Sequence, residues 1–421
     1  MLVCEAMRRR AVAGLVLSLL APGCARPNGG ERPAPKPPDR VEPLVIAPKP
    51  VEAGGSLAIA AVFPTLGRYA VSGEQSLKGA QFAVEDINRA GGIHGRLLRL
   101  AAYRTGSYFV DARQAAADAA RDGALAIVGS NSSELSAAVA EEAEARGVLQ
   151  NTNVSTAADL TFDPQTGRQR PFVFRMCASD EVMGALLAGF AVERLGARRA
   201  AVLYEIGRTY SARLARTFGA RFREAPGREV AEFHYLALET DFRPQLRRIR
   251  EFRPDVVFVP GSFPDATLVA AQSRELDVRA RFLGGDAWSS PLLFQRGAPP
   301  GEAYYVELCS PAPEFDRRYA QAIGSDPPGC RAVLAYDAVH VIAHALSRLG
   351  RLDAAALVGD GLAATRRRLR DTVAANEVDG VTGRIRFDAR GNRRQGVALY
   401  QVEPGPEGQP RALVRGWLGE P

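Results

Sequence analysis

The chain has 421 residues, of which 46% are apolar and 24% are charged, as in ordinary globular proteins. This composition excludes a mostly disordered chain and a polytopic membrane protein, and the length suggests two or three domains. The formal net charge is +7, but the basic residues are nearly all Arg and are spread along the chain. Because they form no cluster, the charge does not predict a nucleic-acid partner.

The first 24 residues have the features of an export signal. Met7-Arg8-Arg9-Arg10 is basic, and an apolar stretch of eleven residues follows from Ala11 to Ala21. Such a stretch is too short to cross a bilayer as a helix but suits a signal peptide. It ends in Leu20-Ala21-Pro22-Gly23-Cys24, which resembles the lipobox of bacterial lipoproteins. We therefore predict a signal peptide over 1–23 and a lipidated Cys24; the alternative is a plain secretory signal with a chance Cys.

Residues 24–55 have the composition of a tether. Eight Pro and four Gly occur between Ala25 and Gly55, with few large apolar side chains. Such a segment cannot bury enough apolar surface to offset the loss of chain entropy, and its Pro content makes it semi-rigid. We predict that it holds the folded region away from a membrane.

From Ser56 onward, short apolar runs alternate with amphipathic helical patterns. In the first series we predict strands at 57–63, 97–103, 124–129 and 148–151. Helices are predicted between them: one through Leu77, Ala80, Val84 and Ile87, then 111–121 and 133–145. This alternation is typical of a parallel sheet with helical crossovers.

The alternation restarts after Pro171. Strands are predicted at 172–176, 200–205, 229–236, 255–260, 281–284 and 303–308, and helices at 181–195, 211–223, 241–252 and 265–276. Further helices are predicted at 313–323, 332–349 and 354–371, and then a β-hairpin over Gly380–Val402 with Gly391-Asn392 near its turn. Two successive series of this kind predict two α/β lobes with parallel sheets.

Three cysteines belong to the folded region: Cys177, Cys309 and Cys330. An exported protein can oxidise its thiols, and a bridge between Cys309 and Cys330 would close a loop of modest length. Three separate buried thiols are the alternative, and the residues alone do not decide between the two.

The sequence lacks the motifs of the common catalytic classes. It contains no GxxxxGK[ST] phosphate loop, no GxSxG nucleophile elbow and no CxxC pair. His340 and His344 are spaced i, i+4, but the Glu of HExxH and an obvious third ligand are missing, so helix packing is favoured over a metal site. The sequence therefore favours a binding protein, with no catalytic residue, metal or cofactor, over an enzyme.

Several segments of the folded region form a recognisable series. The first are Val62-Phe63-Pro64-Thr65-Leu66-Gly67-Arg68-Tyr69, Gly73, Gly79-Ala80 and Glu85-Asp86-Ile87-Asn88-Arg89-Ala90-Gly91-Gly92-Ile93-His94-Gly95-Arg96. Then come Ile127-Val128-Gly129-Ser130, Tyr336-Asp337-Ala338, Gly380-Val381-Thr382-Gly383, Phe387-Asp388 and Gly391. In this order and spacing they resemble the branched-chain amino-acid (Leu/Ile/Val) binding proteins, which are type I periplasmic binding proteins of ABC transporters. The resemblance covers about 56–403.

The resemblance implies a periplasmic binding protein-like fold of type I. Two doubly wound, Rossmann-like α/β lobes would be joined by a hinge that the chain crosses three times. The N-terminal lobe would comprise 56–175 with 311–379, and the C-terminal lobe 176–310 with 380–421. A ligand would bind between the lobes, at the C-terminal ends of parallel strands.

The first lobe supplies the candidate carboxylate site. Ser133 opens a helix, with Asn131 and Glu134 spaced as a capping box, and a helix N-terminus suits an anion. The resemblance implies that Ser133 holds the α-carboxylate of a ligand; simple N-capping is the alternative. It also implies that the segment Val154, Ser155 and Thr156 supplies a backbone group and a Thr hydroxyl.

The second lobe supplies the candidate ammonium site. The resemblance places Tyr210 in the cleft and Asp286, after Leu283-Gly284-Gly285, where the family carries the acid that pairs with the ligand's ammonium. A helix cap is the alternative for Asp286.

Two positions depart from the family pattern. Ser262 and Phe263 stand near a usual Tyr, and Ser72 stands where an aromatic can line the side-chain pocket, with Tyr69 close by. These departures leave the side-chain preference open.

Together with the lipobox pattern that ends at Cys24, the resemblance implies a lipid-anchored, extracytoplasmic protein of the bacterial cell envelope. It would capture an amino acid or a similar small polar solute and deliver it to the permease subunits of an ABC importer. The alternative is a sensory or regulatory envelope lipoprotein of the same fold that acts on a receptor or a cell-wall synthase.

Overall fold

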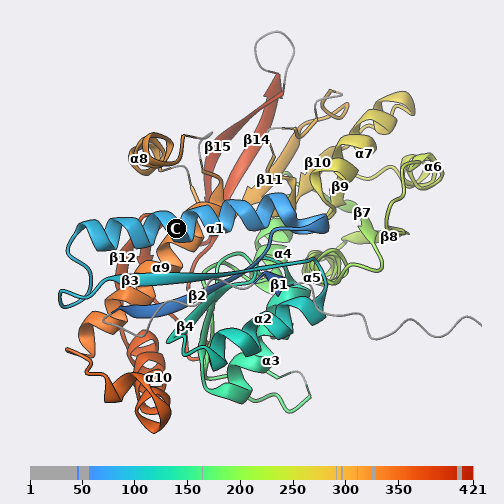
Figure 1. Ribbon diagram of the computed structural model, residues 1–421. Coiled ribbons are helices and arrows are strands. Elements are labelled where there is room, and N and C mark those ends of the chain that lie inside the picture. The colour runs from blue at the N-terminus through green and yellow to red at the C-terminus, as the bar shows by residue number, and fades with distance from the viewer. Residues whose placement is uncertain are drawn as a thin grey trace, which may run out of the picture. The chain divides into compact units, whose positions relative to one another are not determined.

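The computed structural model describes residues 45–46, 56–163, 165–290, 292–294, 297–310, 312–324, 328–404 and 410–420 (Figure 1). The predicted signal peptide and Cys24 lie outside the described residues, as does the predicted tether apart from Val45–Ile46. Among the residues described, no helix is both long enough and apolar enough to cross a membrane.

The first sheet has six strands in the order β1-β3-β2-β4-β5-β6. They are β1 (Val45–Ile46), β2 (Leu57–Pro64), β3 (Leu98–Thr105), β4 (Ala126–Gly129), β5 (Leu149–Thr152) and β6 (Val173–Arg175). Strands β2 to β6 are parallel, and β1 pairs antiparallel with β3 at the edge. Two residues of the segment predicted as a tether thus extend this sheet.

Helices cover both faces of the first sheet. The helices of this lobe are α1 (Ala70–Arg89), α2 (Phe109–Arg121), α3 (Ser133–Arg146), α8 (Pro313–Ile323), α9 (Cys330–Arg348) and α10 (Gly359–Ala375). Alternate residues of a strand point to opposite faces, so Ile59 and Phe63 pack with α1 and α9, whereas Ala60 and Val62 pack with α2 and α3. In Figure 1, α1 runs alongside α9. Burial on both faces explains the apolar strand sequences.

The second sheet has seven strands in the order β15-β14-β11-β10-β9-β7-β8. They are β7 (Arg199–Glu205), β8 (Glu229–Tyr235), β9 (Val256–Val259), β10 (Arg281–Gly284), β11 (Ala303–Glu307), β14 (Val397–Pro404) and β15 (Pro410–Leu418). The first five are parallel, and β14 and β15 are antiparallel additions. The helices of this lobe are α4 (Asp180–Gly189), which continues as a π-helical turn to Arg194, α5 (Thr209–Glu224), α6 (Arg243–Phe252) and α7 (Phe263–Glu275).

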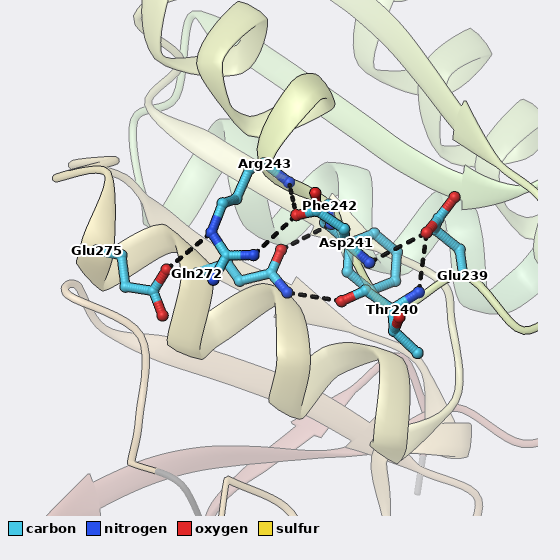
Figure 2. A network of polar contacts seen from close by, with 7 residues as sticks. All are labelled: Glu239, Thr240, Asp241, Phe242, Arg243, Gln272 and Glu275. Carbon is cyan, nitrogen blue, oxygen red and sulfur yellow. Dashed lines mark hydrogen bonds and ion pairs between the residues drawn. The ribbon is translucent and has the colours of Figure 1, made fainter.

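A polar network fixes the chain where it enters α6 (Figure 2). The side chain of Gln272 on α7 accepts a hydrogen bond from the Phe242 backbone N–H at 2.6 Å and donates one to the Thr240 carbonyl at 2.7 Å. Arg243 pairs with Glu275 at 2.7 Å. One side chain of α7 therefore satisfies two backbone groups of the preceding loop, and this holds α6 beside α7 on one face of the second sheet.

The predicted hairpin over Gly380–Val402 is wrong. The segment instead contains a short ladder, β12 (Val378–Gly380) with β13 (Gly383–Ile385), and then β14, whose hairpin partner is β15. Gly391-Asn392 do lie in a turn, which a bridge between Phe387 and Arg393 closes. Tertiary contacts interrupt the pairing: the Asp337 carboxylate accepts the backbone N–H groups of Val381 and Thr382 at 2.8 and 2.9 Å.

Within the residues that the structure describes, the chain passes three times between the two sheets, and the passages lie side by side. The Arg175 N–H donates to the Gly391 carbonyl and the Arg393 N–H to the Arg175 carbonyl, each at 2.9 Å. Gln395 Nε2 donates to the Leu308 carbonyl at 2.5 Å. The third passage therefore begins after Arg393. Residues 380–393, predicted as part of the second lobe, contact α9 and β6 of the first.

The second passage carries a disulfide. Cys309, just after β11, is bonded to Cys330, the first residue of α9, with the two Cα atoms 5.6 Å apart. Cys177, in the first passage, is a buried free thiol. The bridge fixes the end of a second-lobe strand to the start of a first-lobe helix.

Candidate functional site

A cavity of about 80 Å³ is lined by residues of both lobes. First-lobe residues come from the starts of α1 and α3, from the loop after β5 and from the start of α9, and second-lobe residues come from the start of α5 and from the short helix Asp286–Trp288 after β10. The lining residues are Tyr69, Ser72, Asn131, Ser132, Ser133, Glu134, Val154, Thr156, Arg208, Tyr210, Asp286, Ala287 and Arg331. The cavity thus lies at the carboxyl ends of parallel strands from two sheets, where open α/β sheets bind ligands.

The turn between β4 and α3 brings Ser133 to the cavity. Gly129 has a φ of +122°, and a Cβ there would lie 2.3 Å from the Val62 carbonyl oxygen, so glycine is required. The N-cap of α3 is Ser132, whose hydroxyl accepts from the Leu135 N–H at 3.4 Å, and not the predicted Asn131. Ser133, the first residue of the helix, is therefore spared the capping role and lines the cavity.

Asn131 and the loop after β5 complete the first-lobe wall. Asn131 Nδ2 donates to the Ser72 hydroxyl at 2.9 Å. Val154 and Thr156 line the cavity, whereas the Ser155 hydroxyl lies 2.5 Å from that of Ser136 inside the lobe. Of this predicted segment, the first and last residues reach the cavity and the middle one packs behind it.

The second lobe presents Asp286 with a hydrogen-bond partner. The Tyr210 O–H donates to Asp286 Oδ1 at 2.8 Å. Burial raises the pKa of Asp286, and the Tyr210 bond and the charges of Arg331 and Arg208 oppose that shift. A Cβ at Gly285 would lie 2.2 Å from the Tyr210 hydroxyl oxygen, so glycine permits the contact. The result is a desolvated, oriented carboxylate facing a cavity.

Ser262 and Phe263 do not line this cavity. The Ser262 N–H and hydroxyl both donate to Asp265 Oδ2, at 2.9 and 2.7 Å, in a capping box at the start of α7. Phe263 packs against the apolar cluster between the second sheet and helices α6 and α7. The other predicted residues, Tyr69, Ser133, Val154, Thr156, Tyr210 and Asp286, are brought together.

Sequence reasoning missed two cationic residues of the cavity, Arg208 and Arg331. Arg208 immediately precedes α5, and its guanidinium carbon lies 5.2 Å from the centre of the Tyr210 ring. Arg331 is the second residue of α9. In a chain so rich in Arg, neither residue stands out in the sequence. Only their positions could have identified them, because each follows a chain segment that leads into the cleft.

Two ion pairs join the lobes beside the cavity. Arg213 of α5 contacts Asp159, in the short helix Ala158–Leu160, through two nitrogens. Arg68, before α1, lies 3.5 Å from the buried carboxylate of Glu205 at the end of β7. These pairs can form only when the two lobes approach each other.

Comparison with known proteins decides the family. The profile of the periplasmic binding protein family matches residues 56–409. The chain belongs to this family. The resemblance found in the sequence and the two α/β lobes with parallel sheets are both confirmed.

Individual relatives agree with this assignment. The Leu/Ile/Val-binding protein BraC3 of Rhizobium johnstonii is 26% identical over 358 residues, which is 84% of this chain and 93% of that protein. The leucine-, isoleucine-, valine-, threonine- and alanine-binding protein of Pseudomonas aeruginosa is 26% identical over 81% of this chain and 88% of its own length. The crystal structure of the leucine binding protein LivK of Thermotoga maritima superposes with a TM-score of 0.73 at 27% identity, covering 86% of this chain and 99% of that one.

Proposed function

We propose that this chain is the substrate-binding protein of an ABC importer and that it binds an α-amino acid between its lobes. The observation that carries the proposal is the division of the cavity. A helix N-terminus with Ser133 lies on one lobe, and the buried carboxylate of Asp286 lies on the other. The amino-acid-binding relatives support the same class of ligand.

Each group of an amino acid then has a partner. The α-carboxylate accepts from the Ser133 and Thr156 hydroxyls and from the first N–H groups of α3, which lack helical partners. The α-ammonium donates to Asp286, whose position is held by Tyr210. Tyr69 covers the ligand from the first lobe.

Splitting the charges between lobes couples binding to closure. The two ends of a zwitterion are both satisfied only when the lobes are together, so the ligand favours the closed form by its differential affinity. A permease can then distinguish the loaded from the empty protein by the arrangement of its lobes.

The test is Asp286→Asn, measured by calorimetry against a panel of amino acids and their analogues without the amine. Loss of a charge-assisted bond costs about 1.5–3 kcal/mol, or about 10- to 150-fold in affinity, and should affect the amino acid far more than the analogue. Asp277→Asn, an exposed carboxylate of the same lobe, is the control. Equal losses for both ligands place the ammonium elsewhere. No binding of any amino acid at millimolar concentration by the unmutated protein refutes the proposal.

We also propose that lipidation of Cys24 anchors the protein to a membrane of the cell envelope, with the segment between Cys24 and β1 as a spacer. The support is the sequence pattern that ends at Cys24. Cys24→Ala should move the protein from the membrane fraction to the soluble fraction, and unchanged membrane association would rule the anchor out.

A further inference from the structure

The cavity has polar residues besides those assigned to the amino-acid clamp. Arg208, Arg331, Glu134 and Asn131 line it, and the aliphatic side chains in the lining are Val154 and Ala287. An aliphatic ligand side chain would desolvate these groups without offering them a partner, which is unfavourable. The polar lining therefore restricts which side chain the ligand can have, whereas the clamp contacts only the groups common to all amino acids.

Among these groups, Arg208 points most directly to a specific ligand group. Its Nη1 is buried and has no hydrogen-bond partner among the described residues. The nearby carboxylate of Glu205 already pairs with Arg68 at 3.5 Å. The guanidinium lies over the ring of Tyr210, the residue whose hydroxyl donates to Asp286. A buried donor of this kind requires an acceptor, and the cavity is where one can be supplied.

Two further groups strengthen the case. Asn131 uses its Nδ2 on Ser72, while its Oδ1 is buried and has no partner within the described part of the chain. Arg331 lies close enough to Asp286 for its charge to lower the pKa of that carboxyl. The cavity lining thus offers hydrogen-bond donors, on Arg208 and Arg331, and an acceptor, Asn131 Oδ1, to a polar ligand side chain.

Building on the proposed amino-acid function, we propose that the preferred ligand has a side chain ending in a carboxyl or carboxamide oxygen, which accepts a hydrogen bond from Arg208. A carboxylate forms a charge-assisted, bidentate contact with a guanidinium, and a carboxamide supplies one acceptor together with a donor for Asn131. The Glu134 carboxylate lines the same cavity and would repel a ligand carboxylate but not a carboxamide. Ligands with either group are therefore tested. Arg208 is thereby a specificity-determining residue.

The experiment is calorimetry of the full chain with L-glutamate, L-glutamine, L-methionine and L-leucine. The affinity for glutamate or glutamine should be at least about tenfold higher than that for methionine, which has a side chain of similar length without the oxygen. Arg208→Met should reduce the affinity for that ligand by about 10- to 150-fold and should change methionine affinity little. Arg208→Lys should restore part of the loss. Arg216→Met, which replaces an exposed Arg of α5, the helix that Arg208 precedes, is the control.

The outcomes separate the two proposals. If leucine or methionine binds as tightly as glutamate and glutamine, or if Arg208→Met weakens all ligands equally while the thermal unfolding transition is unchanged, the side-chain assignment is wrong and the amino-acid function stands. If the unmutated protein binds none of the common amino acids, the proposed function itself fails.

Discussion

Two buried carboxyl groups, Asp180 and Glu307, lie outside the proposed clamp but close enough to Asp286 for its charge to act on them. Asp180 begins α4 and Glu307 ends β11, and both are almost inaccessible to solvent. Burial raises the pKa of Asp180 from 3.8 to about 7 and that of Glu307 from 4.5 to about 7. Both groups therefore hold a proton in the folded protein at pH values where the unfolded chain has released it.

The sign of the resulting pH dependence follows from proton linkage. Between the unfolded and folded pKa values the native state binds more protons, so the contribution of each group to the free energy of unfolding falls as pH rises through this window, and is fully lost only above it. Asp180→Asn removes one such contribution. The stability of this variant relative to the unmutated protein should rise between about pH 5 and about pH 7.5, as measured by urea denaturation without ligand.

Glu307→Gln provides an independent comparison with the same expected sign. If the stability difference between either variant and the unmutated protein did not change with pH, the carboxyl concerned would titrate near its ordinary value.

At this same scale, the sequence could locate the cavity residues proposed as the clamp but not the cationic residues Arg208 and Arg331 beside them. Ser133, Thr156 and Asp286 each follow a predicted strand end, where topology brings them together. Arg208 and Arg331 belong to no recognisable pattern, and their closeness depends on the packing of two lobes. Ser262 was assigned to the cleft by position, whereas Asp265, three residues later, takes both of its donors.

At the scale of elements, periodicity predicted the regular helices and parallel strands well because each is buried on a defined face. It failed over Gly380–Val402, where short strands with similar alternation pair with different partners. The contacts that break the pairing are polar: the Thr382 N–H donates to Asp337, 45 residues earlier in the chain, and Arg393 donates to the Thr382 hydroxyl. No local pattern predicts them.

The disulfide between Cys309 and Cys330 cross-links elements of different lobes. It closes a loop with a sequence separation of 21, and loop-closure entropy puts its contribution at about 3 kcal/mol. The double variant Cys309→Ala, Cys330→Ala should lose about that much free energy of unfolding in guanidinium titrations. Reductant should destabilise the unmutated protein and leave the double variant unchanged; equal stability of the two proteins under oxidising conditions would contradict the assigned role.

At the scale of the whole folded unit, we expect the ion pair between Arg213 and Asp159 to oppose separation of the two lobes. Both side chains are about a quarter to a third exposed, at 32% and 23%, so the pair is worth only about 0.2–1 kcal/mol. A substitution that replaces this attraction by repulsion between two carboxylates should have a larger effect on the closed form. Arg213→Glu should lower ligand affinity several-fold and increase the radius of gyration of the liganded protein in small-angle X-ray scattering.

A charge swap gives the control. Arg213→Glu combined with Asp159→Arg should recover much of the affinity, because the pair re-forms with reversed sign. If Arg213→Glu bound ligand normally, or if the swap recovered nothing, the pair would have no part in closure.

The central proposal is that one amino acid is held at its two charged ends by different lobes. The crystal structure of the complex with the amino acid that binds most tightly tests this most directly. We expect the α-carboxylate at the start of α3 beside Ser133 and Thr156, and the α-ammonium within hydrogen-bond distance of Asp286. A ligand bound in the reverse orientation, or held by one lobe alone with Asp286 still bonded only to Tyr210, would contradict it.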